Sequence, residues 1–264
     1  MSRIEEGGIF ANYHTHTWRC NHAQGTEREY IETAIRAGMR VLGFADHTPY
    51  PFPEGHVSGF RMRLNQLGDY CKTLTDLKRE YQNDIEIHIG LEAEYYPSHF
   101  EALLRYCEDY PIEYFVQGQH FTHNEYDGWY SGRETKDEQV LADYCAQALE
   151  GQRTGRFLYL AHPDLIHYTG DAQTYERHMR ALCKALKPLG RPLEFNLLGF
   201  AEHRPYPVKR FWEIAGEEGL TAVLGCDAHQ PEALYRPQIV QEAKRILEKH
   251  GVPIVRELEL PTHV

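Results

Sequence analysis

Residues that commonly bind metal ions recur along this chain, each time at the end of a short apolar run. Seven such runs occur, and they end on His14 and His16, Asp46 and His47, Glu92, His120, His162, Asn196, and Asp227 and His229. Imidazole nitrogens and carboxylate oxygens are the usual protein ligands of zinc, manganese and iron. If the ends of these runs meet in space, the chain builds one metal site from many segments.

Two of the pairs alternate in the sequence with one residue between their members. Alternate residues of an extended segment project to the same side, so His14 and His16 can share one ion. This motif alone is weak evidence, because two solvated histidines at a strand end would look the same. Asp227 and His229 repeat the spacing far along the chain, which favours a metal site. The ligands predicted from spacing are His14, His16, His47, Glu92, His120, His162, Asp227 and His229.

Glu92 and Glu94 compete for the role of a bridging carboxylate, because alternate strand residues face the same way. A site with several metals needs a bridge that holds two ions close together. We expect that bridge to be Glu92, the residue nearer the body of the strand, while Glu94 contacts substrate, a neighbouring protein group or solvent. Cys20 and Cys226 are alternative thiolate ligands, although phosphoryl chemistry favours His and carboxylate donors.

Segments with helical periodicity separate the apolar runs. They span Thr26 to Ala37, Leu64 to Tyr81, Glu134 to Glu150, Gln173 to Leu186, Pro207 to Glu218 and Pro231 to His250. A strand followed by a helix thus recurs about seven times, an order in which parallel strands collect their C-terminal ends on one face. We predict an α/β fold, a seven-stranded (β/α) barrel with the metal site at those strand ends. An open doubly wound sheet is the alternative.

The domain organisation follows from the spread of the predicted ligands. They extend from His14 to His229, and no Pro/Gly/Ser-rich linker or repeat interrupts the 264 residues. A site that needs both ends of the chain argues against independent halves, so we predict one domain over residues 1–264. The tail, Val252 to Val264, contains IVREL, which could form an extra edge strand.

Charge and cysteine usage limit the partners. A formal net charge of −11 disfavours nucleic acid, whose phosphates are held mainly by Lys and Arg, but does not exclude a small phosphorylated metabolite. The six cysteines form no CxxC pair, and the chain shows no secretory signal or apolar stretch of membrane-spanning length. We therefore expect a cytoplasmic protein with reduced thiols and no membrane partner.

Other hydrolytic chemistries leave no motif in the chain. A nucleophile elbow, a phosphate-binding P-loop, a dinucleotide fingerprint, a cysteine phosphatase loop and an aspartyl-phosphate motif are all absent from the sequence. A covalent intermediate consequently has no obvious nucleophile. Water activated by metal ions is the remaining route.

These segments together resemble the PHP superfamily, named for polymerase and histidinol phosphatase. The HTH motif, the following His22, and the ADH, GLE, QH, AHPDL and GCDAH segments occur in the family's order over nearly the whole chain. The resemblance implies a distorted seven-stranded (β/α) barrel and two to three divalent ions of Zn, Mn or Fe. By that resemblance, one ion is held by His14, His16, Glu92 and Asp227, a second by Glu92, His120 and His162, and a third by His22, His47 and His229.

Within the superfamily the chain is most similar to the histidinol-phosphate phosphatases. The shared stretches are CNHAQG at 20–25, RMRL at 61–64 and LEFNLLG at 193–199. Two departures affect the expected substrate: the fourth run ends in GQH instead of Gly-Ser-x-His, and the arginine of GFAEHRPYP does not directly follow the glycine. The resemblance implies hydrolysis of L-histidinol phosphate to L-histidinol and phosphate by a hydroxide bridging two metals.

Residue roles follow from the charge of that substrate. Asp227, His229 and Arg204 are the predicted catalytic residues, with Arg204 as the phosphate clamp because a guanidinium grips two oxygens at once. We expect Arg61 or Arg63 to assist it. Glu94, Glu202 and Asn196 could accept hydrogen bonds from the cationic amine, and Trp129, Tyr130 and Tyr206 could line the organic end.

Two other functions remain open at this point. The first is hydrolysis of another small phosphorylated metabolite at the same site. The second is a metal-binding regulatory domain without turnover, although the full ligand set argues against it. A nuclease is disfavoured by the acidic charge and the lack of a basic stripe.

Overall fold

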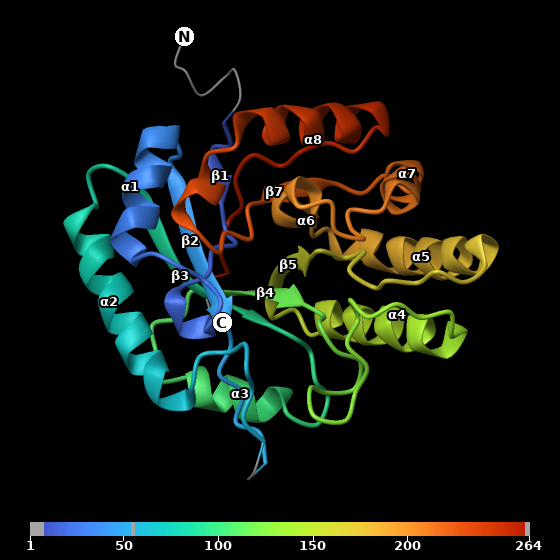
Figure 1. The fold of residues 1–264 in the computed structure, drawn as a ribbon, viewed down its shortest axis with the longest axis horizontal. Coiled ribbons are helices and arrows are strands. Elements are labelled where there is room, and N and C mark those ends of the chain that lie inside the picture. Colours follow the sequence, from blue (N-terminus) through green and yellow to red (C-terminus); the bar gives the residue numbers. More distant parts are fainter. Residues whose placement is uncertain (1–7, 54–55, 262–264) are drawn as a thin grey trace.

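The structure is a computed structural model that describes residues 8–53 and 56–261. It contains seven parallel strands, β1 (Ala11–Asn12), β2 (Val41–His47), β3 (Glu86–Ala93), β4 (Tyr114–Gly118), β5 (Phe157–Ala161), β6 (Leu193–Asn196) and β7 (Ala222–Gly225). The α-helices are α1 (Glu27–Ala37), α2 (Leu67–Glu80), α3 (Phe100–Cys107), α4 (Glu138–Arg153), α5 (Ala172–Leu186), α6 (Leu197–Ala201), α7 (Lys209–Glu217) and α8 (Pro237–Lys249). In Figure 1 the helices surround the strands.

The strands form one sheet in sequence order, β1 to β7, and every neighbouring pair is parallel. The sheet nearly closes through a bridge between Thr15 and Ala228, just beyond β1 and β7. There the His16 N–H donates to the Ala228 carbonyl at 2.9 Å, and the Cys226 N–H donates to the Asn12 side chain at 2.8 Å. The predicted seven-stranded barrel is therefore confirmed, and the open sheet is excluded.

Local sequence explains where the first helix begins and ends. The hydroxyl of Thr26 accepts from the Glu29 N–H while the Glu29 side chain accepts from the Thr26 N–H, a reciprocal capping box. Gly38 ends α1 with φ of 80°, a conformation that glycine adopts without steric cost. Tyr30 and Ile31 form part of its buried face. This helix matches its predicted span, Thr26 to Ala37.

Other boundaries differ from prediction. Helix α7 begins at Lys209, since Pro207 lies in a loop, and Pro231 opens a short 3-10 turn (Pro231–Leu234) before α8 begins at Pro237. The short helices α3 and α6 were not predicted. Among the described residues, no helix has the length and apolar character to span a membrane.

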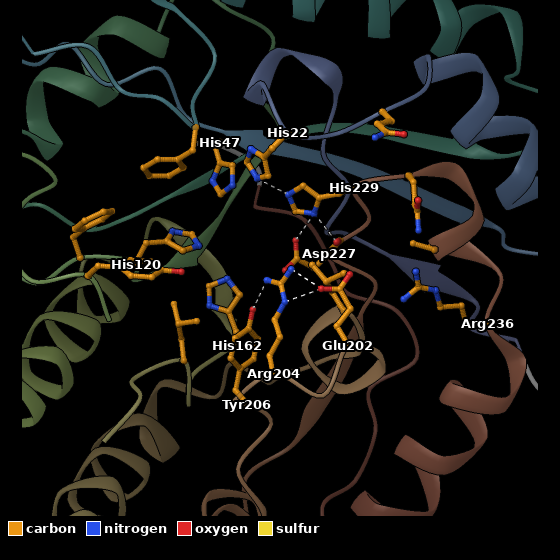
Figure 2. Close-up of a pocket in the computed structure, with 18 residues that line it drawn as sticks. His22, His47, His120, His162, Glu202, Arg204, Tyr206, Asp227, His229 and Arg236 are labelled. Atoms are coloured by element: carbon orange, nitrogen blue, oxygen red, sulfur yellow. Dashed lines mark hydrogen bonds and ion pairs between the residues drawn. The ribbon is translucent and has the colours of Figure 1, made fainter. Parts of the chain in front are cut away.

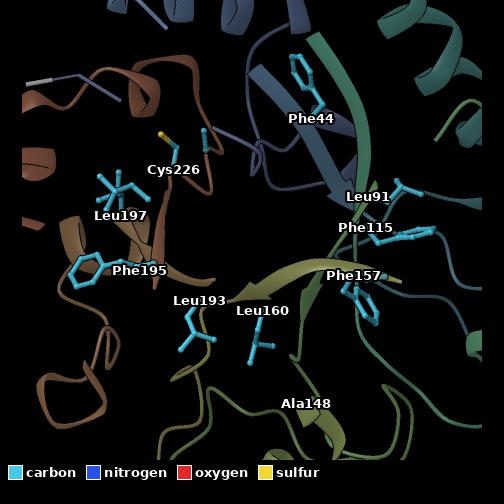
Figure 3. Close-up of a cluster of buried hydrophobic side chains, with 14 of the residues drawn as sticks. Phe44, Leu91, Phe115, Ala148, Phe157, Leu160, Leu193, Phe195, Leu197 and Cys226 are labelled. Carbon is cyan, nitrogen blue, oxygen red and sulfur yellow. The ribbon is translucent and has the colours of Figure 1, made fainter. Parts of the chain in front are cut away.

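Two apolar regions hold the barrel together. The larger lies between the strands and the helices and includes Phe44, Leu91, Phe115 and Phe157 (Figure 3). The smaller lies inside the barrel and contains Ala11, Tyr13, Val41, Ala45, Tyr114, Val116, Tyr159, Ala161 and Val223.

Tyr114 occupies the centre of the smaller region. Its hydroxyl lies 2.8 Å from the Tyr13 carbonyl and 3.0 Å from that of Phe44. A Cβ at Gly43 or Gly90 would overlap the Tyr114 ring or hydroxyl. These two glycines therefore make room for the aromatic side chain that fills the barrel.

The C-terminal tail covers the end of the barrel where the strands begin. Ile254 forms a single parallel bridge with Ala222 at the start of β7, so the predicted edge strand extends no further than that bridge. The Leu258 N–H donates to the Tyr13 hydroxyl at 3.0 Å, and Val255, Leu258 and Leu260 pack on the apolar interior. The tail is thus a cover, and its last three residues, His263 among them, lie outside the described part of the chain.

Candidate metal centre

The side chains of all nine predicted metal ligands converge at the C-terminal ends of the strands. Glu92, at the end of β3, lies at the centre of the group. Its Oε1 is 2.9 Å from His162 Nε2 and 3.5 Å from His120 Nε2. Its Oε2 is 2.9 Å from His47 Nδ1 and 3.5 Å from His14 Nε2. This carboxylate, 1 % exposed, has one oxygen directed to each half of the cluster, as a bridging ligand requires.

Several predicted ligand atoms lie within hydrogen-bond distance of one another. The Nε2 atoms of His14 and His16 are 3.1 Å apart, and those of His22 and His229 are 2.9 Å apart. Asp227 Oδ1 lies 3.0 Å from His16 Nε2. Two nitrogens that bind the same zinc ion, each at about 2.0–2.1 Å, are roughly 3 Å apart. The residues therefore fit divalent cations shared between neighbouring side chains.

A second layer of acceptors orients the histidines. Glu194 Oε2 is 2.7 Å from His14 Nδ1, Asp46 Oδ1 is 3.3 Å from His16 Nδ1, and Glu94 Oε1 is 2.8 Å from His120 Nδ1. The carbonyls of Cys20 and Asp227 serve His22 and His229 in the same way. Such partners fix the tautomer, leaving Nε2 free for a metal.

Sequence reasoning missed the supporting roles of Glu194 and Asp46. A signal was present for each: Glu194 is a fully buried acid inside an apolar strand, two residues before Asn196, and Asp46 directly precedes His47. Buried carboxylates need a partner. Their position beside the predicted ligands could have identified them.

The backbone is adapted to this end of the barrel. His162 and Asp227 have φ of 29° and 46°, left-handed values that cost energy in residues with a Cβ. Glycines occur where carboxylates lie against a strand: a Cβ at Gly118 would overlap Glu92, and one at Gly225 would overlap Glu194.

Charge in the protein alone is balanced within the cluster. Burial would raise the pKa of Glu92, but the neighbouring imidazoles, His120 foremost, hold it well below its ordinary value. Burial would lower the pKa of His14, but the carboxylates around it, Glu194 foremost, raise it well above its ordinary value. Burial holds the pKa of His47 well below its ordinary value. Protons on some histidines thus neutralise carboxylates that divalent cations would otherwise neutralise.

A pocket of about 580 Å³ opens over the cluster (Figure 2). It is lined by His22, Gln24, His47, Phe60, His120, Phe121, Tyr130, His162, Leu165, Leu198, Glu202, Arg204, Tyr206, Asp227, His229, Gln230, Ala233 and Arg236. Two guanidiniums and two carboxylates, Glu202 and Asp227, thus stand beside the histidines. The arrangement suits a small anionic ligand that also carries a polar or cationic group.

The charged residues of the pocket wall differ in how far they are paired. Arg204 donates from Nε and Nη2 to Glu202 Oε2 at 2.9 and 2.7 Å, and from Nη1 to the Tyr206 hydroxyl at 3.2 Å. Burial would lower the pKa of Arg204, but Tyr206 and Glu202 raise it. Arg236, half-buried at the start of α8, makes no side-chain hydrogen bond or ion pair within residues 8–53 and 56–261. Figure 2 shows Arg204 between His162 and Glu202, with Arg236 beyond Glu202.

The structure does not bring every predicted substrate contact into the pocket. Arg61, Glu94 and Asn196 are 2 %, 1 % and 1 % exposed and do not line it. Arg61 is paired with Glu94, and Asn196 donates to Glu194 and Asp227. Protein groups use most of the donors and acceptors of these three residues, so their roles in substrate contact stay predictions.

The remaining predicted residues are divided between pocket and surface. Arg63 is exposed and does not line the pocket, so its predicted assisting role stays a prediction. Tyr130 and Tyr206 line the pocket, whereas Trp129 does not. The ligand atoms of Cys20, His22 and His229 lie within 4.8 Å of one another, so Cys20 stays an alternative ligand. Sequence reasoning missed Arg236.

A PHP domain model matches residues 12–197 of the chain. The chain belongs to the PHP domain family. Among relatives, a probable histidinol-phosphatase from Deinococcus radiodurans is 29 % identical over 226 residues, covering 83 % of this chain and 85 % of the relative. A probable histidinol-phosphatase from Schizosaccharomyces pombe is 26 % identical over 267 residues, covering 90 % of this chain and 86 % of the relative.

The same fold is seen in a solved structure. The crystal structure of histidinol phosphate phosphatase from Lactococcus lactis, complexed with zinc, L-histidinol and phosphate, superposes with a TM-score of 0.72 at 18 % identity. The match covers 96 % of this chain and 98 % of that one. The shared fold therefore extends over nearly all of the present chain.

Proposed function

We propose that this protein is a metal-dependent phosphatase that converts L-histidinol phosphate and water to L-histidinol and phosphate, in the cytoplasm, as a step of histidine biosynthesis. The observation that carries the proposal is the nine-ligand cluster around Glu92 at the floor of a pocket with two arginines. Both relatives are named as probable histidinol-phosphatases, and the Lactococcus lactis enzyme binds zinc, L-histidinol and phosphate; both observations support the proposal. Nucleic acid and membranes are not among the proposed partners.

The cluster would hold two to three divalent ions of Zn, Mn or Fe. His14, His16, Glu92 and Asp227 would hold one, Glu92, His120 and His162 a second, and His22, His47 and His229 a third. Bound divalent ions supply positive charge for phosphoryl oxygens and lower the pKa of water to about 7, as zinc does. The carboxylate oxygens of Glu92 and Asp227 face the histidine nitrogens that would hold the ions, so the cluster would attract cations before substrate binds.

The protein's own groups bind the two charged ends of the substrate. The phosphate dianion draws Arg204 away from Glu202, and the released carboxylate accepts from the substrate's ammonium group. The Arg204–Glu202 pair is exposed to solvent, so opening it costs little free energy. Tyr206 keeps one nitrogen of Arg204 in place, and Arg236, which has no hydrogen-bond or ion-pair partner among the described residues, provides a second guanidinium for the anion.

Apolar side chains complete the pocket around the reacting group. Phe60, Phe121, Leu165 and Leu198 line it together with the charged residues. They exclude water from the wall and strengthen the ionic contacts made there. A site with buried hydrogen-bond acceptors rejects substrate analogues that leave those acceptors unpaired.

The test is turnover of a panel of phosphate monoesters by metal-reconstituted protein. We expect kcat/KM for L-histidinol phosphate to exceed that for an aryl phosphate by at least about a hundredfold. Elemental analysis should find at least two metals per chain, since nine ligands exceed the coordination of one ion. Equal turnover of both esters would redirect the proposal to another small phosphorylated metabolite, and one metal or none would end the cluster hypothesis.

Arg204→Ala and Arg236→Ala separate substrate recognition from metal binding. Both variants should retain their metals. We expect Arg204→Ala to lose roughly 2–5 kcal/mol of transition-state binding, the usual cost of removing one member of a desolvated charge pair. Unchanged kcat/KM for histidinol phosphate in both variants would remove the two arginines from the proposed phosphate site.

A further inference from the structure

Arg61 is the centre of a buried ionic chain that ends at the metal cluster. The residue is 2 % exposed, lies in the loop between β2 and α2, and contacts two carboxylates from other loops. Its Nη2 donates to Glu94 Oε1 at 2.6 Å, and its Nε donates to Glu125 Oε2 at 2.5 Å. Glu125 Oε1 in turn lies 3.1 Å from His56 Nε2. Three loops at the metal end of the barrel are thus fastened by one guanidinium.

This ionic chain contacts the metal cluster through one oxygen atom, Glu94 Oε1. Glu94 Oε1 accepts from Arg61 and faces His120 Nδ1 at 2.8 Å, while Glu94 Oε2 has no partner among the described residues. A carboxylate accepts hydrogen bonds, so the proton of His120 lies on Nδ1 and its Nε2 lone pair faces Glu92. Without Arg61, the Glu94 carboxylate would lose the charged donor that sets its rotamer and would hold His120 less firmly.

The same guanidinium also supports a wall of the pocket. It lies 4.4 Å from the centroid of the Phe60 ring, close enough for a cation–π contact. Phe60 lines the pocket and packs against the imidazoles of His47 and His120. Arg61 therefore does not line the pocket and contacts no predicted metal ligand. It contacts Phe60, which lines the pocket, and Glu94, which contacts His120.

Burying an arginine carries a desolvation cost. Its presence here therefore indicates a role that a hydrophobic side chain could not supply. Replacing a buried ion pair by well-packed apolar residues is often neutral or stabilising. Here the two acids come from different loops, and one of them orients a predicted ligand. The arrangement is therefore better explained by positioning of His120 than by stability alone.

We propose that Arg61 is a positioning residue that acts through Glu94 to hold His120 in its metal-binding orientation; this inference rests on the proposed metal site. A chelator-stripped protein titrated with Zn²⁺ in competition with a chromophoric chelator measures the effect without substrate. Arg61→Met should bind the zinc held by His120 about tenfold or more weakly, as loss of an orienting partner usually does. Arg61→Lys should recover part of the affinity, since it keeps the charge but not the fork.

Glu125→Gln is the matched control, because it removes the opposite ion pair of Arg61 and leaves the contact with Glu94. We expect its zinc affinity to stay within about twofold of wild type, well short of the tenfold expected for an orienting partner, even if its thermal midpoint falls. Equal losses in Arg61→Met and Glu125→Gln would show a general loop defect and overturn the proposal. Folded Arg61→Met with wild-type zinc affinity would overturn it as well.

A double-mutant cycle keeps the proposal testable if Arg61→Met does not fold. Arg61→Lys and Glu94→Gln should each weaken zinc binding, and the double variant should be no weaker than Glu94→Gln alone, because Arg61 acts through Glu94. Additive losses would overturn it. The proposed substrate plays no part in these measurements, so an error there would leave this result intact, whereas a wild-type protein that binds no zinc would end both proposals.

Discussion

The two ends of this barrel are built from the same seven strands but from opposite kinds of side chain. Where the strands end, seven imidazoles and the Asp227 carboxylate crowd around Glu92, and two of these residues, His162 and Asp227, have left-handed backbone. Where the strands begin, Tyr114 fills an apolar interior that the tail covers with Leu258 and Leu260. The metal end contains the buried charges and the strained backbone, and the other end contains the apolar packing that stabilises the barrel. Chemistry and stability are thus separated along the barrel axis, so substitutions at the two ends should affect different measurements.

Asp227→Asn tests the metal end most severely. It removes a charge that faces His14 and His16 while keeping the shape of the side chain. Because bound metals supply several kcal/mol of transition-state stabilisation, kcat/KM should fall by at least about a thousandfold, and elemental analysis should find fewer metals per chain. Wild-type metal content with full activity would contradict the assignment of Asp227 as a ligand.

A pair of identical substitutions compares the ends directly. Gly118→Ala places a methyl group against Glu92, so it should lower metal content and reduce activity by about a hundredfold, a typical cost for a displaced catalytic group. Gly90→Ala places the same group against Tyr114 and should cost about 1–3 kcal/mol of unfolding free energy through overpacking. Urea unfolding, metal analysis and kcat are the measurements. Activity loss in Gly90→Ala at unchanged stability would break the proposed separation.

The zinc affinity of the metal end of the barrel should depend on pH. Burial opposes the charge of His14 and His16, but their carboxylate partners raise both pKa values well above the ordinary value. A metal must displace these protons, so zinc affinity should already weaken as pH falls toward 6.5, by about tenfold per pH unit for each proton displaced. Competition titrations between pH 8.5 and 5.5 measure this. A flat profile above pH 6.5 would show that neither histidine is protonated in the metal-free protein.

The same shifts have opposite consequences for metal-free stability. Raised histidine pKa values stabilise the folded state below about pH 6.5, and this contribution disappears as pH rises through the folded value. Burial opposes the ionised forms of Glu92 and Asp227, but their histidine neighbours depress both pKa values. Their contribution is present above the unfolded pKa and disappears as pH falls. The free energy of unfolding of metal-free protein, measured with urea from about pH 8.5 to about pH 3, should therefore pass through a maximum between about pH 4.5 and pH 6.5.

Leu258→Ala should have the smallest effect. The side chain is only partly buried, so it should cost about 1 kcal/mol, less than the 2–5 kcal/mol of a fully buried leucine. Metal content and kcat should not change, because the residue lies at the end opposite to the cluster. A fall in metal affinity would show that the tail influences the cluster through the barrel interior.

The sequence was most informative where one local rule decided the outcome. A strand end projects its residues to a known side, so the predicted ligands could be placed before the loops were known. Substrate contacts depend on loop packing, which no period encodes: Arg61 is turned inward onto Glu94 and Glu125, while Arg236 reaches the pocket from the start of a helix. The short helices α3 and α6 carry too few turns for periodicity to reveal them.

The seam between β1 and β7 has a consequence for how the protein is made. Its backbone contacts are few, and the side chains that flank it belong to His14 and His16 on one side and to Asp227 and His229 on the other. An ion that binds both sides would fasten the first strand to the last. During synthesis the early histidines must wait for more than two hundred residues before their partners emerge. The proposed ion held by His14, His16, Glu92 and Asp227 would therefore bind only after the barrel has closed.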